Sequence, residues 1–390
     1  MKKNNNPDVV IIGGGLIGAS VAYYLSKEGL SVVLLEKNRL ASGSSGACSG
    51  KVWLGTKKEG LHLRLALMSL KLLKGLLQEM SYTVECDRGG EMLLIEKEQD
   101  LQFMENFVEN QTQAGVDICI LTKEETLEMQ PALAPNSIVD ATFSPLWITI
   151  NPMDFLFGMM EEAKKLGADI RRDTTVAEIG VSSSCVKSVR TNQGEIYTGC
   201  IVNAAGVHAP QIGKMLGLEI PIVPLRGQIL ITEAVEPLVR VATTEGRYLI
   251  VKRDPEMLEK TTTLGITLGI SQTPRGNIHI GASKEFVGYN TETIPEAMAV
   301  LAQRAIAFFP KLSGVNVIRS FAGLRPYTPD GVPILGRVQG IEGFLMAAGH
   351  GGDGVALAPI TGKLVAEIIT KREPSISIDK FTLDRFDVTS

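Results

Sequence analysis

Short, fully apolar runs separated by glycine dominate the first forty residues. Residues 9–12 and residues 32–35 are apolar at every position, which is typical of strands buried on both faces of a parallel sheet. Between them, residues 19–28 have a helical pattern that Gly29 ends. The pattern therefore predicts a strand, a helix and a second strand at the start of the chain.

Further along, apolar residues at helical spacing predict helices over residues 61–80, 123–129, 153–166, 297–309 and 356–365, with a charged helical stretch before residue 114. Strands are predicted over residues 91–95, in a meander across residues 170–202, and over residues 221–231. Many β-branched residues between about 240 and 289 indicate a second sheet. Helices alternating with strands favour an α/β fold.

The turn after the first strand reads Gly13-Gly14-Gly15-Leu16-Ile17-Gly18, a G-x-G-x-x-G motif. Gly13 allows a tight turn, Gly15 lets a pyrophosphate approach the backbone, and Gly18 lets helix and strand pack closely. Glu36 closes the second strand, where a carboxylate accepts hydrogen bonds from ribose hydroxyls and repels the 2′-phosphate of NADP. Strand, glycines, helix and acid together predict a dinucleotide site.

The loop after Glu36 is rich in serine and glycine and contains Lys37, Ser42, Ser44, Ser45 and Gly46. Such a loop suits backbone and hydroxyl contacts to phosphates and to the edge of a flavin ring. The alternative is a flexible linker, although an ordinary connection at this point is much shorter.

Composition limits the functions open to the chain. Its 390 residues carry a formal net charge of −4, with 44% hydrophobic and 21% charged residues, as in a soluble globular protein of two or three domains. This balance argues against a broad nucleic-acid-binding surface. The five cysteines include no CxxC pair, so we expect reduced thiols, no metal centre, and a cytoplasmic location without a transmembrane segment.

Four further stretches extend the evidence over almost the whole chain. They are Asn203-Ala204-Ala205-Gly206, Arg226-Gly227-Gln228 after Pro224, residues 322–336, and Gly349-His350-Gly351-Gly352-Asp353-Gly354. With the N-terminal motif, they resemble the D-amino acid oxidase superfamily of FAD-dependent amine and amino-acid oxidoreductases. The resemblance implies a Rossmann-like FAD/NAD(P)-binding domain with an inserted mixed-sheet α+β substrate domain.

The resemblance also implies domain limits and a cofactor site. Residues 1–90, 146–225 and 326–390 are expected to form a discontinuous FAD-binding domain, and residues 91–145 and 226–325 the substrate-binding domain. The expected FAD-binding residues are Gly13, Gly15, Leu16, Ile17, Gly18, Glu36, Lys37, Ser42, Ser44, Ser45, Gly46, Val176, Ala204, Ala205, Gly206, Gly227, Arg325, Gly351, Gly352, Asp353, Gly354 and Val355.

Three residues are candidates for substrate handling. Arg325 resembles a family arginine that clamps the substrate carboxylate, and a planar guanidinium suits that task. Tyr248 resembles a tyrosine that meets the same carboxylate, and His350 is placed to touch the flavin ring. The alternatives are a structural arginine paired with an acid, a half-buried strand tyrosine, and a packed or capping histidine. Lys51, Trp53 and His62 follow the flavin loop without an assigned role.

Departures from the family pattern refine the expected chemistry. Gly323 stands where monomeric sarcosine oxidases attach FAD through cysteine, so non-covalent FAD is expected. Gly352 stands where some glycine oxidases carry a second arginine. His279 stands where an oxygen-activating lysine is found, which favours a dehydrogenase with another electron acceptor.

The chain most resembles the beta-type catalytic subunits of sarcosine, proline and hydroxyproline dehydrogenases and of hydrogen cyanide synthase. We therefore expect oxidation of the C–N bond of a small amino or imino acid by hydride transfer to flavin N5. Partner subunits carrying FAD, FMN or an iron–sulfur cluster are expected with it. The alternatives are a self-sufficient glycine or sarcosine oxidase producing hydrogen peroxide, a non-catalytic electron-relay subunit, and a plain NAD dehydrogenase.

Overall fold

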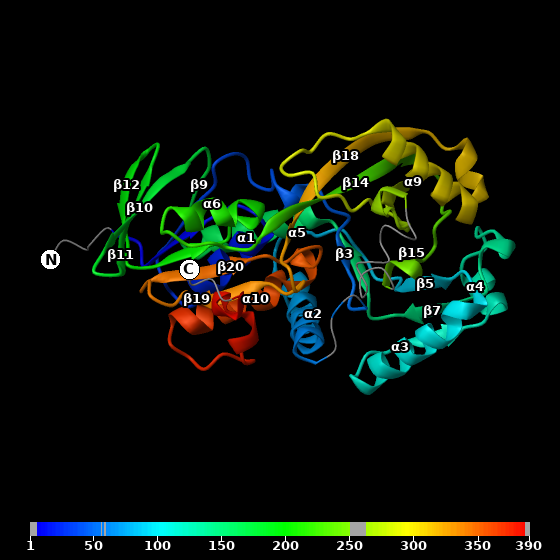
Figure 1. Cartoon of the computed structure of the whole chain (residues 1–390), viewed down its shortest axis with the longest axis horizontal. Helices are drawn as coiled ribbons and strands as arrows, with labels where there is room; N and C mark the ends of the chain where they lie inside the picture. The colour runs from blue at the N-terminus through cyan, green and yellow to red at the C-terminus, as the bar shows by residue number, and fades with distance from the viewer. Residues whose placement is uncertain (1–5, 56, 58–59, 250–262, 387–390) are drawn as a thin grey trace.

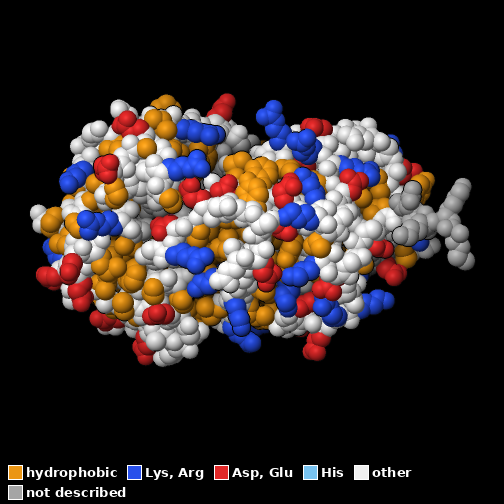
Figure 2. Space-filling model, turned by 180° about the vertical axis from the view of Figure 1, so that it is seen from behind, with side chains coloured by type: hydrophobic (Ala, Val, Ile, Leu, Met, Phe, Trp, Pro, Cys, Tyr) orange, Lys and Arg blue, Asp and Glu red, His pale blue; other side chains and the backbone are white. Residues whose placement is uncertain are grey.

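A computed structural model describes residues 6–55, 57, 60–249 and 263–386 of the chain. Figure 1 shows an elongated molecule with one large sheet in each half. Among the described helices, none combines the length and the hydropathy needed to cross a bilayer. On the face seen in Figure 2, basic and acidic side chains are interspersed, so that face offers no extended basic surface to a polyanion.

A six-stranded sheet forms the core of one half. Its spatial order is β19 (Ile334–Arg337), β20 (Phe344–Ala348), β13 (Ile201–Asn203), β1 (Val9–Ile12), β2 (Val32–Leu35) and β9 (Asp169–Arg171). All neighbours are parallel except β19 and β20. The two strands predicted at the start of the chain are confirmed at their exact limits.

Both faces of this sheet are covered, which explains why its strands are apolar at every position. Val9 and Ile11 pack into a core with α1 (Leu16–Lys27), α2 (Leu61–Glu79), α5 (Pro152–Lys165) and α10 (Gly354–Ile369). Val10 and Ile12 face the opposite core, formed with α6 (Ala209–Lys214) and the meander β10 (Val176–Ser182), β11 (Cys185–Thr191) and β12 (Gly194–Tyr197). Full burial of each such side chain stabilises the fold by about 1.5–3 kcal/mol.

The second half is built on an eight-stranded mixed sheet. Its order is β18 (Val317–Tyr327), β14 (Val223–Ala234), β17 (Asn277–Gly281), β16 (Gly269–Gln272), β15 (Ala242–Glu245), β5 (Glu91–Ile95), β7 (Asp140–Ser144) and β6 (Cys119–Leu121). Beside it lie α3 (Leu101–Gln113), α4 (Lys123–Met129) and α9 (Pro295–Phe308) (Figure 1). A small sheet of β3 (Lys51–Val52), β8 (Ile148–Ile150) and β4 (Cys86–Asp87) completes the described strands.

The eight-stranded sheet presents two different faces because side chains alternate along a strand. Leu230, Ile280 and Ile270 lie in one register row and pack against α9 in a hydrophobic core. The next row contains Ile229, Gly281, Gly269 and Thr244, and all four residues line a cavity on the other face. The sheet thus has one packed face and one glycine-rich face open to the cavity.

The predicted mixed α/β fold is confirmed. The strands of the six-stranded sheet come from the N-terminal, middle and C-terminal segments assigned to the FAD-binding domain, while the exact domain limits stay a prediction. The alternative of a strand position for Tyr248 is wrong, because β15 ends at Glu245 and residues 247–249 form a helical turn. The second sheet predicted between about 240 and 289 contains β15, β16 and β17, and residues 250–262 of that segment lie outside the described residues.

Candidate functional site

A cavity of about 550 Å³ runs from the carboxyl edge of the six-stranded sheet to the glycine-rich face of the eight-stranded sheet. Ligands of open α/β sheets bind at this edge, where loops follow the parallel strands. The loops after β1, β2, β13 and β20 contribute Gly13–Gly15, Glu36, Ala204–Gly206 and His350–Gly354. Segments distant in sequence therefore meet in one site.

Glycine is required at the positions after β1 for two different physical reasons. Gly13 has a φ of +120°, and a β-carbon there would overlap the carbonyl oxygen of Ala204. A β-carbon on Gly18 would overlap the carbonyl of Gly13, so Gly18 serves the close packing of α1 on β1. A β-carbon on Gly15 would meet only Ser45 Oγ, at 3.2 Å, and Gly15 lines the cavity. Gly15 thus keeps ligand space open, while the other two shape the backbone.

Glu36 is held in place at the end of β2. Its Oε2 accepts a hydrogen bond from the Gly14 N–H at 2.7 Å, and its Oε1 accepts one from the Asn38 N–H at 2.8 Å. These two bonds fix the carboxylate at the cavity wall, and each oxygen retains a further lone pair for a ligand hydroxyl. The arrangement suits the ribose of a dinucleotide.

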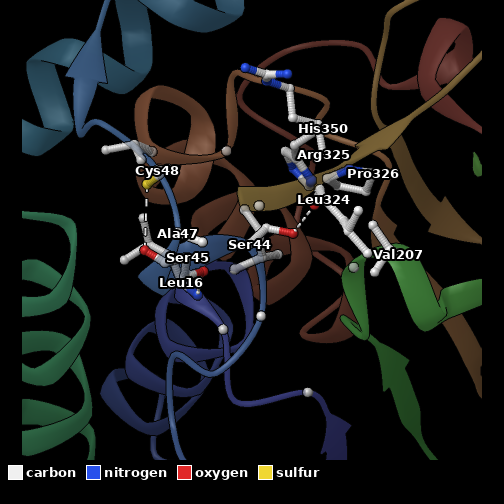
Figure 3. A pocket seen from close by; sticks show the side chains of 18 of the residues that line it. Leu16, Ser44, Ser45, Ala47, Cys48, Val207, Leu324, Arg325, Pro326 and His350 are labelled. Carbon is white, nitrogen blue, oxygen red and sulfur yellow. Dashed lines mark hydrogen bonds between the residues drawn. The ribbon is translucent and has the colours of Figure 1, made fainter. Parts of the chain in front are cut away.

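The serine-rich loop is ordered by contacts with both halves of the molecule (Figure 3). Ser45 Oγ accepts a hydrogen bond from the Leu16 N–H at 2.9 Å, at the start of α1. The Ser44 hydroxyl donates to the carbonyl of Leu324 on β18. These bonds exclude the flexible-linker alternative for the loop, which spans from the helix N-terminus to the strand that carries Arg325.

Arg325 is a basic group at the substrate end of the cavity. Its Nη1 donates to the carbonyl of Ser283 at 3.1 Å, and no carboxylate among the described residues lies within ion-pair distance of it. Burial lowers the pKa of the guanidinium, while Tyr248 and Cys48 act in the opposite direction. A buried cation with only carbonyl partners is suited to a carboxylate ligand, and the alternative of a structural pair with an acid has no support here.

Tyr248 also lines the cavity, from the helical turn after β15. Its ring lies 5.2 Å from the ring of Trp53, and the Nζ of Lys284 lies 3.8 Å from its centroid. Trp53 itself packs edge-on against Trp147 at 5.7 Å between ring centroids. These aromatic contacts form an apolar wall beside Arg325.

His350 lines the cavity but already has a partner inside the protein. Its Nε2 lies 3.0 Å from Thr361 Oγ1 on α10, and burial lowers its pKa to about 3. The ring is therefore neutral at physiological pH. Its position favours a packing role, and contact with a flavin stays a prediction.

Asp353 begins α10 and forms a buried ion pair that the sequence did not reveal. Its Oδ1 lies 2.7 Å from the Nζ of Lys57, whose side chain is 1% exposed, and its Oδ2 lies 3.8 Å from His62 Nε2. Lys57 also donates to the carbonyl of Trp53 at 2.8 Å. This pair ties the segment after the flavin loop to the glycine-rich start of α10.

A second polar cluster at the substrate end was also missed. Lys51, Thr244 and His279 line the cavity. Lys51 and Thr244 each donate a hydrogen bond to the buried carboxylate of Glu91. Burial and the charge of Lys51 lower the pKa of His279. These residues lie on different strands, so no local sequence signal joins them.

The cavity contains most of the predicted cofactor-binding residues. Lining it are Gly13, Gly15, Leu16, Ile17, Glu36, Lys37, Ser42, Ser44, Ser45, Val176, Ala204, Ala205, Gly206, Gly227, Arg325, Gly351, Gly352, Asp353, Gly354 and Val355. Gly18 and Gly46 do not line it, since each packs against backbone, Gly46 against the carbonyl of Ala41. In the ranges described above, no cluster of three metal-ligating side chains occurs.

The residues present fit FAD. Gly15, Gly206 and Gly351 line the cavity without a side chain, so the space beside their backbone stays open. Phosphates and a flavin ring require such open space next to backbone N–H groups. The Glu36 carboxylate stands at one end of the cavity and the glycine-rich start of α10 near the other, where helix N–H groups favour negative charge on a bound ring.

Comparisons with known proteins agree with this geometry. The family model described as DAO, FAD dependent oxidoreductase, matches residues 8–368. Glycine oxidase of Geobacillus kaustophilus is 28% identical over 388 residues, covering 97% of each chain. Hydrogen cyanide synthase subunit HcnC of Pseudomonas aeruginosa is 27% identical, covering 98% of this chain and 97% of that protein.

Among solved structures, L-proline dehydrogenase from P. horikoshii superimposes with a TM-score of 0.88 and 26% identity, covering 98% of both chains. The likeness therefore spans both sheets and the cavity between them, rather than the dinucleotide unit alone.

Proposed function

The chain belongs to the DAO family of FAD-dependent oxidoreductases, and from this premise we propose that it oxidises the carbon–nitrogen bond of a small amino or imino acid. The observation that carries the proposal is Arg325, a buried guanidinium without a described acid partner, in the same cavity as the FAD cradle. A substrate carboxylate is the natural partner for that fork.

When bound, FAD supplies the hydride acceptor, flavin N5. Gly13, Gly15, Glu36 and the serine loop would hold its dinucleotide part, and Gly351 and Gly352 its ring. The task left to the substrate end is positioning, because the carbon that carries nitrogen must lie over the ring. Arg325 would grip the carboxylate, while Trp53 and Tyr248 exclude water from one side.

No general base is needed in this scheme. The substrate ammonium loses its proton to solvent first, and the neutral amine then gives up hydride. The product is an iminium ion, which water hydrolyses. The neutral imidazoles of His279 and His350 add no competing positive charge at the cavity wall.

We further propose that the chain is the catalytic subunit of a dehydrogenase and transfers electrons to partner subunits carrying FAD, FMN or an iron–sulfur cluster. The similarity to hydrogen cyanide synthase subunit HcnC supports this. The similarity to glycine oxidase supports the second candidate, an oxidase that reduces oxygen itself. The five free cysteines support work in a reducing compartment such as the cytoplasm.

The decisive experiment is anaerobic bleaching of the purified yellow protein by glycine, sarcosine, both proline enantiomers, hydroxyproline isomers, D-alanine and iminodiacetate. Bleaching by at least one is expected, and failure of all of them would support a non-catalytic relay instead. Stopped-flow mixing of the reduced protein with oxygen then separates the two candidates. Slow reoxidation fits the dehydrogenase, whereas rapid peroxide formation fits the oxidase.

A further inference from the structure

The substrate end of the cavity has a floor almost free of side chains. Gly281 and Gly269 occupy successive positions of one register row, between Ile229 on β14 and Thr244 on β15. Gly227 lies two residues before Ile229 and therefore faces the same side of the sheet. Bare backbone across three neighbouring strands leaves room for a flat, elongated ligand lying along the sheet.

A basic group stands over each end of this floor. The guanidinium of Arg325 occupies the place of a β-carbon on Gly227 of β14. The Nζ of Lys51 lies 3.5 Å from the place of a β-carbon on Gly269 of β16. Two strand spacings and a two-residue offset separate these glycines, so their β-carbon positions are roughly 12 Å apart. Each cation lies 3.5 Å or less from one of these positions.

The ammonium of Lys51 is held in one position by hydrogen bonds. Its Nζ donates to Glu91 Oε1 at 2.6 Å and to Thr244 Oγ1 at 2.9 Å, and the Thr244 hydroxyl donates to the same Glu91 oxygen at 2.6 Å. Glu91 is 3% exposed, whereas Lys51 is 14% exposed and lines the cavity. The carboxylate thus lies behind the ammonium, which presents its remaining N–H to a ligand.

A second observation at the same end points to a ligand. Thr267 is 1% exposed and lines the cavity, yet its Oγ1 has no hydrogen-bond partner among the residues that the structure describes. It lies two residues before Gly269, and both Thr267 and Lys51 line the cavity. A buried hydroxyl without a partner costs free energy unless a ligand or water satisfies it.

Glu91 is the acid that contacts Lys51, and it does so from behind, while no described carboxylate is paired with Arg325. Glu36 stands at the ribose end, and Asp353 is ion-paired with Lys57. The substrate end therefore offers N–H donors to an anion at each of two positions. When about 4 Å is allowed at each cation for a hydrogen-bonded carboxylate, roughly 4–5 Å is left between the two carboxyl carbons. Bridges of two or three atoms, as in aspartate and iminodiacetate, have this span.

We propose that the substrate is a dicarboxylic amino or imino acid, in which Arg325 binds the carboxylate beside the amine and Lys51, with Thr267, binds a second carboxylate two or three atoms away. This inference rests on the proposed function and names the substrate class for the same site.

The test compares two ligands that the holoenzyme cannot oxidise. Glutarate carries the second carboxylate and butyrate lacks it, and binding of each is read from the perturbed flavin absorption and from protection against thermal unfolding. We expect glutarate to bind at least 10-fold more tightly than butyrate. A ratio near one in the wild-type protein overturns the proposal.

Variants assign the preference to Lys51. The double variant Lys51→Met/Glu91→Gln removes both charges of the pair and leaves no buried charge unpaired, so it is designed to fold. The preference for glutarate over butyrate should drop about 10-fold in the double variant and persist in Lys51→Arg. Lys164→Met, which removes an exposed Lys–Glu pair on α5, is the matched control and should keep the ratio. A ratio retained in the double variant overturns the role of Lys51.

Catalysis is measured separately with iminodiacetate and sarcosine under anaerobic conditions. If no amino acid bleaches the flavin while glutarate is still preferred, the proposed function fails and the second acid site stands. If sarcosine bleaches the flavin as efficiently as iminodiacetate and glutarate has no advantage, the proposed function stands and the dicarboxylate inference fails.

Discussion

The guanidinium of Arg325 on β18 lies over Gly227 of the neighbouring strand β14, in the space that a β-carbon at residue 227 would occupy. Arg325 is paired with Leu225 in the ladder, and its side chain reaches diagonally toward Gly227. The glycine therefore sets where the carboxylate-binding fork stands. Neither residue alone determines the geometry of the substrate end.

Gly227→Ala should displace the guanidinium and weaken substrate use. Because a displacement of about 1 Å can cost on the order of 10²-fold in rate, we expect anaerobic flavin reduction to lose 10-fold or more in efficiency. Gly199→Ala is the matched control, since a β-carbon there meets nothing within 4 Å. Unchanged reduction in Gly227→Ala would show that Arg325 does not hold the substrate.

Arg325→Lys keeps the charge but loses the planar fork that binds a carboxylate through two N–H groups. The expected result is a loss on the order of 10²-fold in the efficiency of flavin bleaching. Arg319→Lys makes the same change on the exposed end of β18 and should have little effect. Equal behaviour of the two variants would remove Arg325 from the site.

Gly15→Ala separates cofactor binding from stability. Its added β-carbon meets only Ser45 Oγ, at 3.2 Å, so the apoprotein should melt close to the wild-type temperature. The same methyl group faces the cavity, and crowding there should weaken FAD binding about 10-fold. Fluorescence titration of the apoprotein with FAD measures this. Gly13→Ala, in contrast, should lower apoprotein stability, because Gly13 has a φ of +120°. If Gly15→Ala binds FAD normally, the motif does not hold phosphates.

His350 should make the protein less stable in acid. Its pKa is lowered to about 3 in the folded protein, against about 6.5 in an unfolded chain. Between these values the unfolded state binds one more proton, so the free energy of unfolding falls by about 1.4 kcal/mol for each unit of decreasing pH. The lowered pKa of His279 acts in the same direction. Denaturant unfolding near pH 7 and near pH 5 should show a smaller difference in His350→Gln than in the wild type. An equal difference would contradict burial of a neutral ring.

The cofactor half of the site was largely predictable because its parts are local. The first strand, Gly13, the helix start and Glu36 follow one another within about forty residues, and their order reflects the geometry of one βαβ unit. Its hydrogen bonds, such as Gly14 N–H to Glu36, close short loops. Periodicity and glycine spacing therefore carry enough information to indicate both the fold of this unit and that it binds a dinucleotide.

The substrate half was not predictable to the same degree. A strand position was the alternative considered for Tyr248, yet the chain turns into a helix after Glu245. The buried pair Lys57–Asp353 joins the loop before α2 to the start of α10, and neither residue has a local pattern that indicates a buried partner. Propensity and periodicity report neighbours along the chain and not contacts across it.

The sequence by itself determined the βαβ unit and the dinucleotide class, because each depends on residue type and short-range spacing, and its resemblance to a family pattern indicated the candidate arginine. Only the tertiary structure placed Arg325 over Gly227 and brought Lys51 to Thr244, 193 residues away. The first contact depends on register in the eight-stranded sheet, and the second on how the small sheet that contains β3 packs against it. The energies that select that register are spread over many buried side chains, and therefore no single motif records them.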